Sequence, residues 1–231
     1  MPCFRLDWLH QSVSSLLNQT EKDIEIVIVQ DNPGWEIKKE DLSDERIKLI
    51  KNPQNMGIAN SYNIAIANST GEIICPLDDD DMAIPERALI TYDALQRRSV
   101  IDVFYGSQFI MNEDGVIKHY APAKKFDWEI LRHHNPIPHC GCGYRRRVGE
   151  SVQYKPKYVR GNDWVFFMDC HLAGYKFGYT KTPLLYHRIH SKSHTHQAST
   201  LKKEEQYKVR SVIAEDYDIP LEIKQEVQYI S

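Results

Sequence analysis

The stretch Glu72-Ile73-Ile74-Cys75-Pro76-Leu77 runs directly into four adjacent carboxylates, Asp78-Asp79-Asp80-Asp81. The apolar part has the composition of a short buried strand. Four neighbouring carboxylates repel one another, so the compact state needs a cation or solvent to relieve them. Open α/β sheets bind ligands at the carboxyl ends of their strands, and hard cations such as Mg²⁺ and Mn²⁺ prefer carboxylate oxygen. The stretch predicts a metal and phosphate site, with a solvated acidic turn as the alternative.

Strand and helix patterns alternate around this stretch. Short apolar runs typical of strands stand at Ile24–Val29 and Ile47–Ile50, and helical periodicity covers Leu6–Leu17, Ile58–Asn68 and a segment beginning at Pro85. This alternation predicts an α/β fold with a mostly parallel central sheet flanked by helices. Because such a sheet begins with a strand and this chain begins with a helix, we expect a first strand of ~6 residues to be missing at the N-terminus.

The pattern changes after about residue 105. Strand-like runs at Val100–Tyr105, Ser107–Met111 and Val116–His119 surround an Asp-Gly turn. An apolar helix is expected from Asp163 and a polar helix over about Leu201–Glu215. The chain is therefore predicted to contain two halves that share one sheet, followed by a tail: residues 1–105, 106–195 and 196–231.

The overall composition excludes several classes of protein. The chain has 231 residues, and its 29 basic and 32 acidic residues give a net charge of −3. A protein that binds the nucleic-acid backbone in bulk needs a basic excess. No apolar run reaches the ~20 residues of a membrane-spanning helix, and the first residues lack a signal-peptide pattern. Five cysteines are a sparse and odd set, which favours the reducing cytoplasm over a secreted disulfide fold.

Short motifs follow one another along residues 1–195. They are Met1-Pro2-Cys3-Phe4, Leu16-Leu17-Asn18-Gln19-Thr20, Val27–Asn32, Asn55-Met56-Gly57-Ile58-Ala59 with Asn63, Thr70-Gly71-Glu72 ahead of Leu77–Asp81, Gly161-Asn162-Asp163-Trp164 and Tyr186-His187-Arg188-Ile189-His190. Each motif alone is weak, but in this order the chain resembles the family 2 glycosyltransferases of the GT-A fold. The resemblance implies a Rossmann-like sheet and a metal-dependent, inverting transfer from a nucleotide sugar.

The resemblance also implies roles for single residues. The nucleotide pocket would be formed by Pro2 and Phe4 beside the base, Asp31 at the base edge, and Asp78 or Asp79 at the ribose. On this interpretation residues 1–105 bind the nucleotide sugar, residues 106–195 bind the acceptor and carry the catalytic base, and residues 196–231 form a helical tail.

The reacting groups are implied in the same way. Asp80 would bind Mn²⁺ or Mg²⁺ on the diphosphate of the donor, and Arg188 and His190 would contact the phosphates. Asp163 would act as general base and take the proton of the acceptor hydroxyl.

Several residues have simpler explanations that stay open. Asp163 is also a suitable helix N-cap. His187, His190, His194 and His196 suit either a solvated loop or a zinc site, although no cysteine or carboxylate lies among them at a suitable spacing. Cys140-Gly141-Cys142 is too tight for a zinc knuckle, so buried thiols are expected there. The run Arg145-Arg146-Arg147 suits a solvated face or an anionic lipid.

Three positions depart from the family pattern. Gln30 stands where an aspartate is frequent, Arg5 replaces the usual asparagine, and Asn162 replaces the usual glutamate before the base. Because Asp163 and the four carboxylates are present, these departures concern acceptor specificity more than the chemistry.

The sequence thus predicts an enzyme that moves a hexose from a nucleotide-diphosphate sugar, with UDP favoured, to a glycan or lipid-linked acceptor in surface polysaccharide synthesis. A cytoplasmic location with peripheral contact at the inner membrane face is expected. Two alternatives remain. One is a catalytically impaired nucleotide-sugar-binding module. The other is a sugar-1-phosphate nucleotidyltransferase, which needs a glycine-rich basic loop that the segment Pro2–Asp7 lacks.

Overall fold

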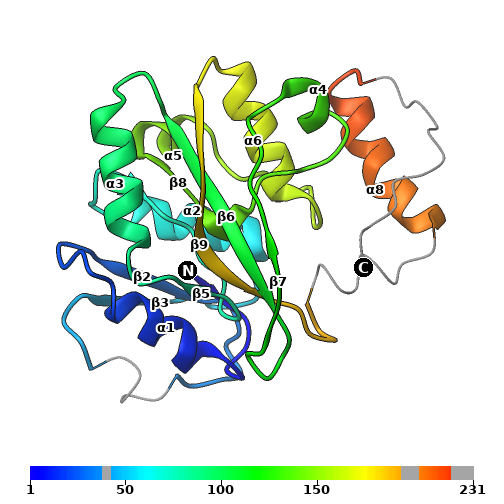
Figure 1. Ribbon diagram of the computed structural model, residues 1–231. Coiled ribbons are helices and arrows are strands. Elements are labelled where there is room, and N and C mark those ends of the chain that lie inside the picture. The colour runs from blue at the N-terminus through cyan, green and yellow to red at the C-terminus, as the bar shows by residue number, and fades with distance from the viewer. Residues whose placement is uncertain (38–42, 194–202, 220–231) are drawn as a thin grey trace.

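The computed structural model describes residues 1–37, 43–193 and 203–219 and shows two sheets flanked by helices (Figure 1). The strands of the described residues are β1 (Pro2–Cys3), β2 (Ile26–Gln30), β3 (Ile47–Lys51), β4 (Ile73–Ile74), β5 (Met82–Ala83), β6 (Val103–Met111), β7 (Ile117–Ala121), β8 (Cys142–Arg145) and β9 (Phe177–Arg188). The helices are α1 (Leu9–Leu17), α2 (Ile58–Ala67), α3 (Arg87–Arg97), α4 (Trp128–Leu131), α5 (Arg146–Ser151), α6 (Asn162–Leu172), α8 (Lys203–Asp216) and the short 3₁₀ helix η2 (His139–Gly141).

The first sheet is parallel and has the order β1-β2-β3. Strand β1 pairs with β2 along two residues, and the amino group of Met1 extends this contact by donating to the carbonyl of Val27 at 2.7 Å. Strand β2 is buried along its whole length, and α1 packs Leu9 and Val13 into the same apolar cluster. These elements confirm the predicted α/β fold with parallel strands. The expectation that the described chain begins with a helix is wrong, because β1 precedes α1, and the expectation of a missing first strand stays a prediction.

The second sheet is mixed, with the order β4-β8-β6-β9-β5 and with β7 paired to β6. Strands β6 and β9 run parallel through the centre of Figure 1, whereas the other pairs are antiparallel. The predicted α/β class holds, but this part of the fold has a separate sheet whose strands are mixed rather than mostly parallel. Because β4 pairs with β8, segments from both halves of the chain meet in one sheet.

The strand predicted over Glu72–Leu77 is shorter than expected and is limited to Ile73–Ile74. Arg87 explains the difference. Its side chain is buried, and its guanidinium donates to the carbonyls of Pro76 and Cys142 at 2.7 and 2.9 Å. A side chain thus satisfies backbone carbonyls that a neighbouring strand would otherwise bind, just where the chain approaches the four carboxylates.

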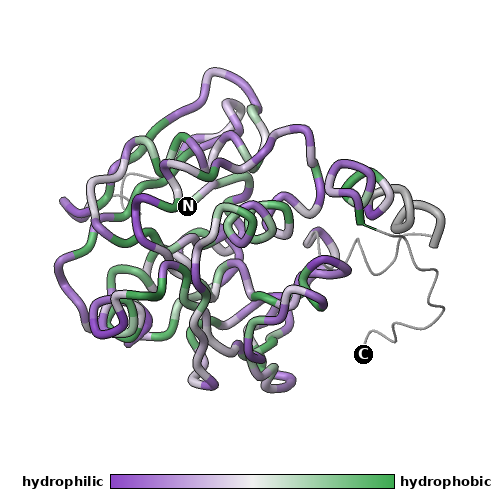
Figure 2. The backbone as a smooth tube through the Cα atoms, turned by 90° about the horizontal axis from the view of Figure 1, so that it is seen from above, coloured by the Kyte–Doolittle hydropathy of each residue, from purple (hydrophilic) through white to green (hydrophobic). Residues whose placement is uncertain are grey.

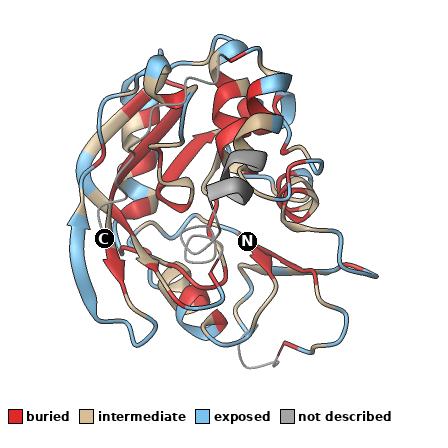
Figure 3. Cartoon of the chain, turned by 90° about the vertical axis from the view of Figure 1, so that its right-hand side faces the viewer, coloured by how far each residue is buried: buried red, intermediate tan, exposed pale blue. Residues whose placement is uncertain are grey.

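The larger apolar core surrounds α6, whose residues Trp164–Met168 are all buried. Figure 3 shows buried residues in red on several helices and strands. The indole N–H of Trp164 donates to the carbonyl of Leu131 and ties α6 to α4. Removing one large aromatic side chain from such a core costs about 3–5 kcal/mol, so this packing holds the first turn of α6 firmly. In contrast, β7 lies at the exposed edge of its sheet.

The described part of the tail is helical, as predicted, and packs on the second half of the chain. Ile213 of α8 is buried in the core around α6, and the hydroxyl of Tyr217 donates to Asp169 at 2.7 Å. The predicted domain boundaries stay predictions. Hydrophobic and hydrophilic stretches alternate along the chain (Figure 2), and no helix among the described residues is long and apolar enough to cross a membrane.

Candidate active site

The four adjacent carboxylates Asp78–Asp81 lie in the segment between β4 and β5, and each has hydrogen-bond partners within the fold. Leu77 is buried before them, Asp79, Asp80 and Asp81 are buried, and Asp78 is half-buried. One oxygen each of Asp78, Asp80 and Asp81 lies within 4.8 Å of the others. The solvated acidic turn considered from the sequence is therefore wrong, because most of these side chains are withdrawn from water.

Asp80, the predicted metal ligand, contacts two side chains. Its Oδ2 accepts from Nη2 of Arg5 at 2.7 Å and lies 3.0 Å from Nε2 of His190. The other ring nitrogen, Nδ1, accepts from the N–H of Lys192 at 3.2 Å, so the hydrogen of a neutral His190 is on Nε2 and points at Asp80. Burial, with Arg5 and Arg188 nearby, lowers the pKa of His190 to about 4, which keeps the ring neutral.

The charge of Asp80 is poorly compensated by these contacts. Burial, together with the charges of Asp81, Asp78 and Asp79, raises the pKa of Asp80 to about 8. A divalent cation beside the carboxylate would favour its charged form. The oxygen donors of Asp78, Asp80 and Asp81 also match the hard ligands that Mn²⁺ and Mg²⁺ take, so the residues fit the expected metal.

Asp79 fixes the end of β1. Its Oδ2 accepts from the backbone N–H groups of Phe4 and Arg5 at 2.6 and 2.7 Å, and its Oδ1 accepts from the guanidinium of Arg5 at 3.0 Å. Burial raises the pKa of Asp79 although Arg5 opposes the shift. Of the predicted base-pocket residues, Phe4 thus lies directly beside Asp79 and is half-buried, while Pro2 is buried in β1.

Asp81 pairs with His187 at the end of β9. Nδ1 of His187 lies 3.0 Å from Oδ1 of Asp81, and the N–H of Arg188 donates to the same oxygen at 2.9 Å. Burial opposes both charges. The attraction of the pair outweighs it, raising the pKa of His187 to about 9 and holding the pKa of Asp81 below its usual range.

Arg188, a predicted phosphate contact, is 1% exposed, and its guanidinium is engaged within the chain. Its acceptors are the carbonyls of Asp80, Asn112 and Glu113, Oε1 of Gln11 and the sulfur of Met82. These account for all five N–H groups of an arginine. Arg188 therefore joins β9, α1 and the carboxylate segment, and it would have to leave these partners to reach a diphosphate.

Asp31, the predicted base contact, is also fully buried. Its carboxylate accepts from Nδ2 of Asn52 at 2.6 Å and from the N–H groups of Met56 and Gly57, both at 2.8 Å. Gly57 has a φ of +84°, which suits glycine, and it is the N-cap of α2. In this arrangement Asp31 holds the turn before α2, and its role at a nucleobase stays a prediction.

Asp163 lies in the first turn of α6, after Gly161 with its φ of +72°. Asn135 donates to its Oδ2 at 2.8 Å. The charges of Asp163 and of Asp78 both act on the ring of His139, whose pKa is lowered by burial. The ring of His139 therefore lies near the predicted base and near the four carboxylates Asp78–Asp81, which we call the carboxylate row. The N-cap position of α6 is Gly161 and Asp163 lies inside the first turn, so the simple N-cap explanation for Asp163 is wrong.

The basic run after β8 is tied into the fold. Arg145 donates to the carbonyls of Leu95 and Ile101, Arg146 to that of Gly71, and Arg147 pairs with Asp102. These contacts tie Arg145 and Arg146 into the fold, whereas Arg147 is exposed, as expected for a solvated face. Of the histidines considered as zinc ligands, His187 and His190 are bound to carboxylates, and His194 and His196 lie outside the described residues.

Sequence reasoning missed several members of the site. Arg5 was noticed only as a departure from the family pattern, yet it contacts Asp79 and Asp80. Tyr62 donates to Oδ1 of Asp78 at 2.5 Å, and His139 was not singled out at all. A tyrosine inside a helix and a histidine in irregular chain carry no local signal, because only the tertiary fold brings them to the carboxylates.

Comparisons with known proteins now add to this geometry. Residues 1–152 match the family described as Glycosyl transferase family 2. The chain belongs to glycosyltransferase family 2. An uncharacterized glycosyltransferase of Methanocaldococcus jannaschii is 30% identical over 209 residues, which cover 87% of this chain and 71% of that protein.

Other relatives point the same way. The UDP-Glc:alpha-D-GlcNAc-diphosphoundecaprenol beta-1,3-glucosyltransferase WfgD of Escherichia coli is 27% identical over 174 residues, or 73% of this glycosyltransferase and 66% of WfgD. The crystal structure of S. aureus TarS 1-349 in complex with UDP-GlcNAc aligns with a TM-score of 0.70 at 16% identity, covering 93% of this chain and 64% of that one. The likeness confirms the expected GT-A type of fold.

Proposed function

We propose that this family 2 glycosyltransferase transfers a hexose from a UDP-sugar to a glycan or lipid-linked acceptor in the synthesis of a surface polysaccharide, with inversion at the anomeric carbon. The observation that carries the proposal is that Asp78 lies beside His139, and that the charge of Asp163 at the start of α6 also acts on the ring of His139. The names of WfgD and TarS support a nucleotide-sugar donor, and that of WfgD supports a lipid-linked acceptor.

The donor is assigned to the carboxylate row. Asp78 would bind the ribose, Pro2 and Phe4 would line the base pocket, and Asp80 would hold Mn²⁺ or Mg²⁺. When bound, the cation would neutralise negative charge on the leaving diphosphate. His190 keeps a neutral Nε2–H on Asp80 and so fixes the orientation of this carboxylate.

Asp163 is assigned the proton transfer. Asn135 binds Oδ2, so Oδ1 is the oxygen that we assign to the acceptor proton. As Asp163 takes this proton, the acceptor oxygen forms a bond to the anomeric carbon, and the bond from that carbon to the diphosphate breaks. A single displacement of this kind inverts the configuration. A lipid-linked acceptor would bring the cytoplasmic enzyme into peripheral contact with the inner face of the membrane.

The test combines binding with turnover. Calorimetry with UDP, in Mn²⁺ and in EDTA, should show binding that needs the metal and that Asp80→Asn abolishes. Asp163→Asn should bind UDP as the unaltered chain does but lose about 10²–10⁴-fold in kcat for UDP-sugar consumption, because an amide cannot accept the proton. If UDP binds with the same affinity in EDTA as in Mn²⁺, the proposed role of the metal in donor binding is wrong. If Asp163→Asn turns over the donor as fast as the unaltered chain, Asp163 is not the general base.

The second candidate, a binding module without catalysis, makes a different prediction. Such a module binds UDP in Mn²⁺ and consumes no donor with any acceptor extract, and Asp163→Asn then changes nothing. The engagement of Arg188 inside the fold is the observation that favours it, because an expected phosphate contact is occupied.

A further inference from the structure

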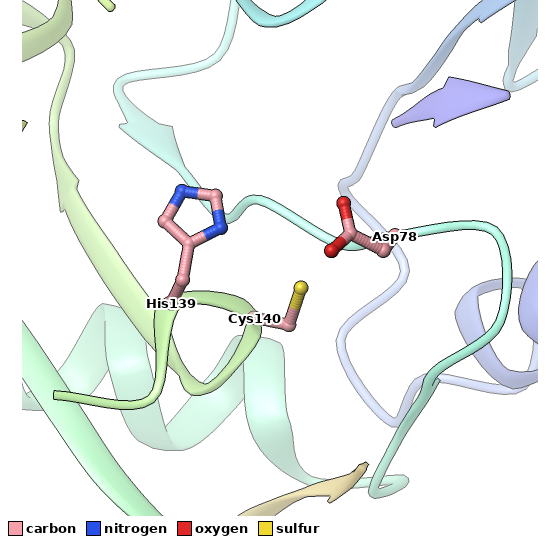
Figure 4. Close-up of side chains that lie close together, drawn as sticks. All are labelled: Asp78, His139 and Cys140. Atoms are coloured by element: carbon pink, nitrogen blue, oxygen red, sulfur yellow. The ribbon is translucent and has the colours of Figure 1, made fainter. Parts of the chain in front are cut away.

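A second group of metal-ligating side chains lies beside the carboxylate row. His139 and Cys140 come from the short helix η2, and Asp78 faces them from the segment that follows β4 (Figure 4). One ligand atom from each of the three lies within 4.8 Å of the other two. This group differs from the Asp78, Asp80 and Asp81 group, because it offers a nitrogen, a sulfur and an oxygen rather than three oxygens.

The surroundings orient two of the three donors. Nε2 of His139 is hydrogen-bonded to the hydroxyl of Tyr154 at 2.7 Å, and Figure 4 shows the other ring nitrogen turned toward Asp78 and Cys140. Tyr62 binds Oδ1 of Asp78, which leaves Oδ2 for a further partner. Hydroxyls that hold the ring of a histidine and the direction of a carboxylate are typical of the outer shell of a metal site.

We propose that Asp78, His139 and Cys140 form a binding site for Zn²⁺, and that Zn²⁺ held there excludes the sugar nucleotide. Zinc takes nitrogen, sulfur and carboxylate oxygen, whereas Mn²⁺ and Mg²⁺ prefer oxygen. One carboxylate and one thiolate balance the two positive charges. Three protein ligands leave a fourth position for water, as in zinc sites that are open to solvent.

Binding requires the loss of one proton. Cys140 is buried, and its sulfur binds a metal ion as the thiolate. The S–H bond breaks as the S–Zn bond forms, and the proton leaves to solvent. Zinc affinity should therefore rise as pH increases.

Exclusion of the donor rests on the function proposed above, because it assumes that Asp78 contacts the ribose. A zinc ion would take the free oxygen of Asp78 and fill the space between Asp78 and His139. Free Zn²⁺ would then act as an inhibitor that competes with the sugar nucleotide rather than with the acceptor.

Cobalt spectroscopy tests the site without any need for activity. The full chain is titrated with Co²⁺ in a non-thiol reductant, and thiolate coordination is read from a sulfur-to-cobalt charge-transfer band in the near ultraviolet. We expect one equivalent of Co²⁺ to give this band and Zn²⁺ to remove it. Cys140→Ser should lose the band, whereas Cys75→Ser, a half-buried thiol outside the group, should keep it.

Two further variants keep the test decisive if Cys140→Ser does not fold. His139→Gln should keep the thiolate band but weaken Co²⁺ binding at least tenfold, and Tyr154→Phe should weaken it about 10–100-fold as an outer-shell change. A missing band in the unaltered chain, or a band that survives Cys140→Ser, overturns the site.

The exclusion is measured separately by UDP calorimetry in Mn²⁺, with and without one equivalent of Zn²⁺. We expect Zn²⁺ to weaken UDP binding at least tenfold in the unaltered chain and in Cys75→Ser, but not in Cys140→Ser. A cobalt band with unchanged UDP affinity overturns the exclusion and leaves the zinc site standing. Absence of UDP binding in the zinc-free sample is instead a failure of the proposed function, and the cobalt result is unaffected by it.

Discussion

Replacing Arg5 with glutamine should strengthen the binding of Mn²⁺. Nη2 of Arg5 lies 3.0 Å from Asp79 and 2.7 Å from Asp80, so a guanidinium occupies the side of Asp80 to which a cation would bind. Its Nη1 also donates to the carbonyl of Lys192 at 3.2 Å. A metal ion at Asp80 must therefore displace a positive charge, or share the carboxylate with it.

The size of the effect follows from the geometry of the pair. Two unit charges about 4 Å apart attract by about 4 kcal/mol at an effective dielectric constant of 20. The side chain of Arg5 is 21% exposed and that of Asp80 is 10% exposed, so solvent screens part of this attraction. If half or less of the attraction between Arg5 and Asp80 must be given up when the metal binds, the cost is about 1–2 kcal/mol. Removing this cost, Arg5→Gln should bind Mn²⁺ roughly 5–30-fold more tightly.

Electron paramagnetic resonance of free Mn²⁺ during a titration measures this affinity directly. The matched control is Arg46→Gln. This variant breaks the ion pair between Arg46 and Asp44, whose atoms lie 2.9 Å apart and which is not part of the site. Its Mn²⁺ affinity should be unchanged. Without metal, Arg5→Gln should also melt at a lower temperature, because it leaves buried carboxylates unpaired, and Mn²⁺ should restore more of its stability than in the unaltered chain. Equal or weaker Mn²⁺ binding by Arg5→Gln would refute the idea that Arg5 and Mn²⁺ compete for Asp80. Arg5 would then instead hold the carboxylates in the orientation that binds the metal.

Three further outcomes are expected. Asp31→Asn should lower the melting temperature by about 3–10 °C, because an amide cannot accept from all the donors that surround this buried carboxylate and costs about 1–3 kcal/mol. His187→Gln should flatten the pH dependence of stability. Because Asp81 raises the pKa of His187 from 6.5 to about 9, the pair stabilises the fold fully below about pH 6.5 and loses this contribution as pH rises through about 9, which denaturant titrations from pH 6 to 9.5 can follow. Asn135→Ala should lower kcat about 10–100-fold with unchanged UDP affinity, since it frees Asp163 to turn away from the acceptor; an equal loss in both quantities would argue for a general disruption of the site.

The sequence alone predicted the position of those helices and strands whose apolar pattern is complete within a few neighbouring residues. Helix α2 and strands β2 and β3 begin within two residues of their predicted positions, because each combines an apolar run with a polar or glycine boundary. Strand β9 was not predicted. Its residues Thr180, Thr182 and Pro183 break the apolar alternation, and its length is set by parallel pairing with β6, which no local pattern reports.

In the candidate active site, the sequence could not predict which residues are partners of one another. The family resemblance implied that Arg188 contacts a phosphate, which stays a prediction, but nothing in the sequence indicated the partners that Arg188 has inside the fold. In the fold, the carbonyls of Asn112 and Glu113 approach it from the β6–β7 turn and Gln11 approaches it from α1. Which partner neutralises which charge depends on distances between segments far apart in sequence, so the nature of the residues was predictable and their pairing was not.

The partners of the four carboxylates divide them into two kinds. Asp79 and Asp81 accept backbone N–H groups, from Phe4 and Arg5 and from Arg188, so they cannot turn without moving the chain. Asp78 and Asp80 are held by side chains alone, Tyr62 for the first and Arg5 with His190 for the second. A side-chain partner can rotate away at little cost to the backbone. The alternation along the run therefore leaves the first and third carboxylates available to a ligand, while the second and fourth fix the segment that carries them.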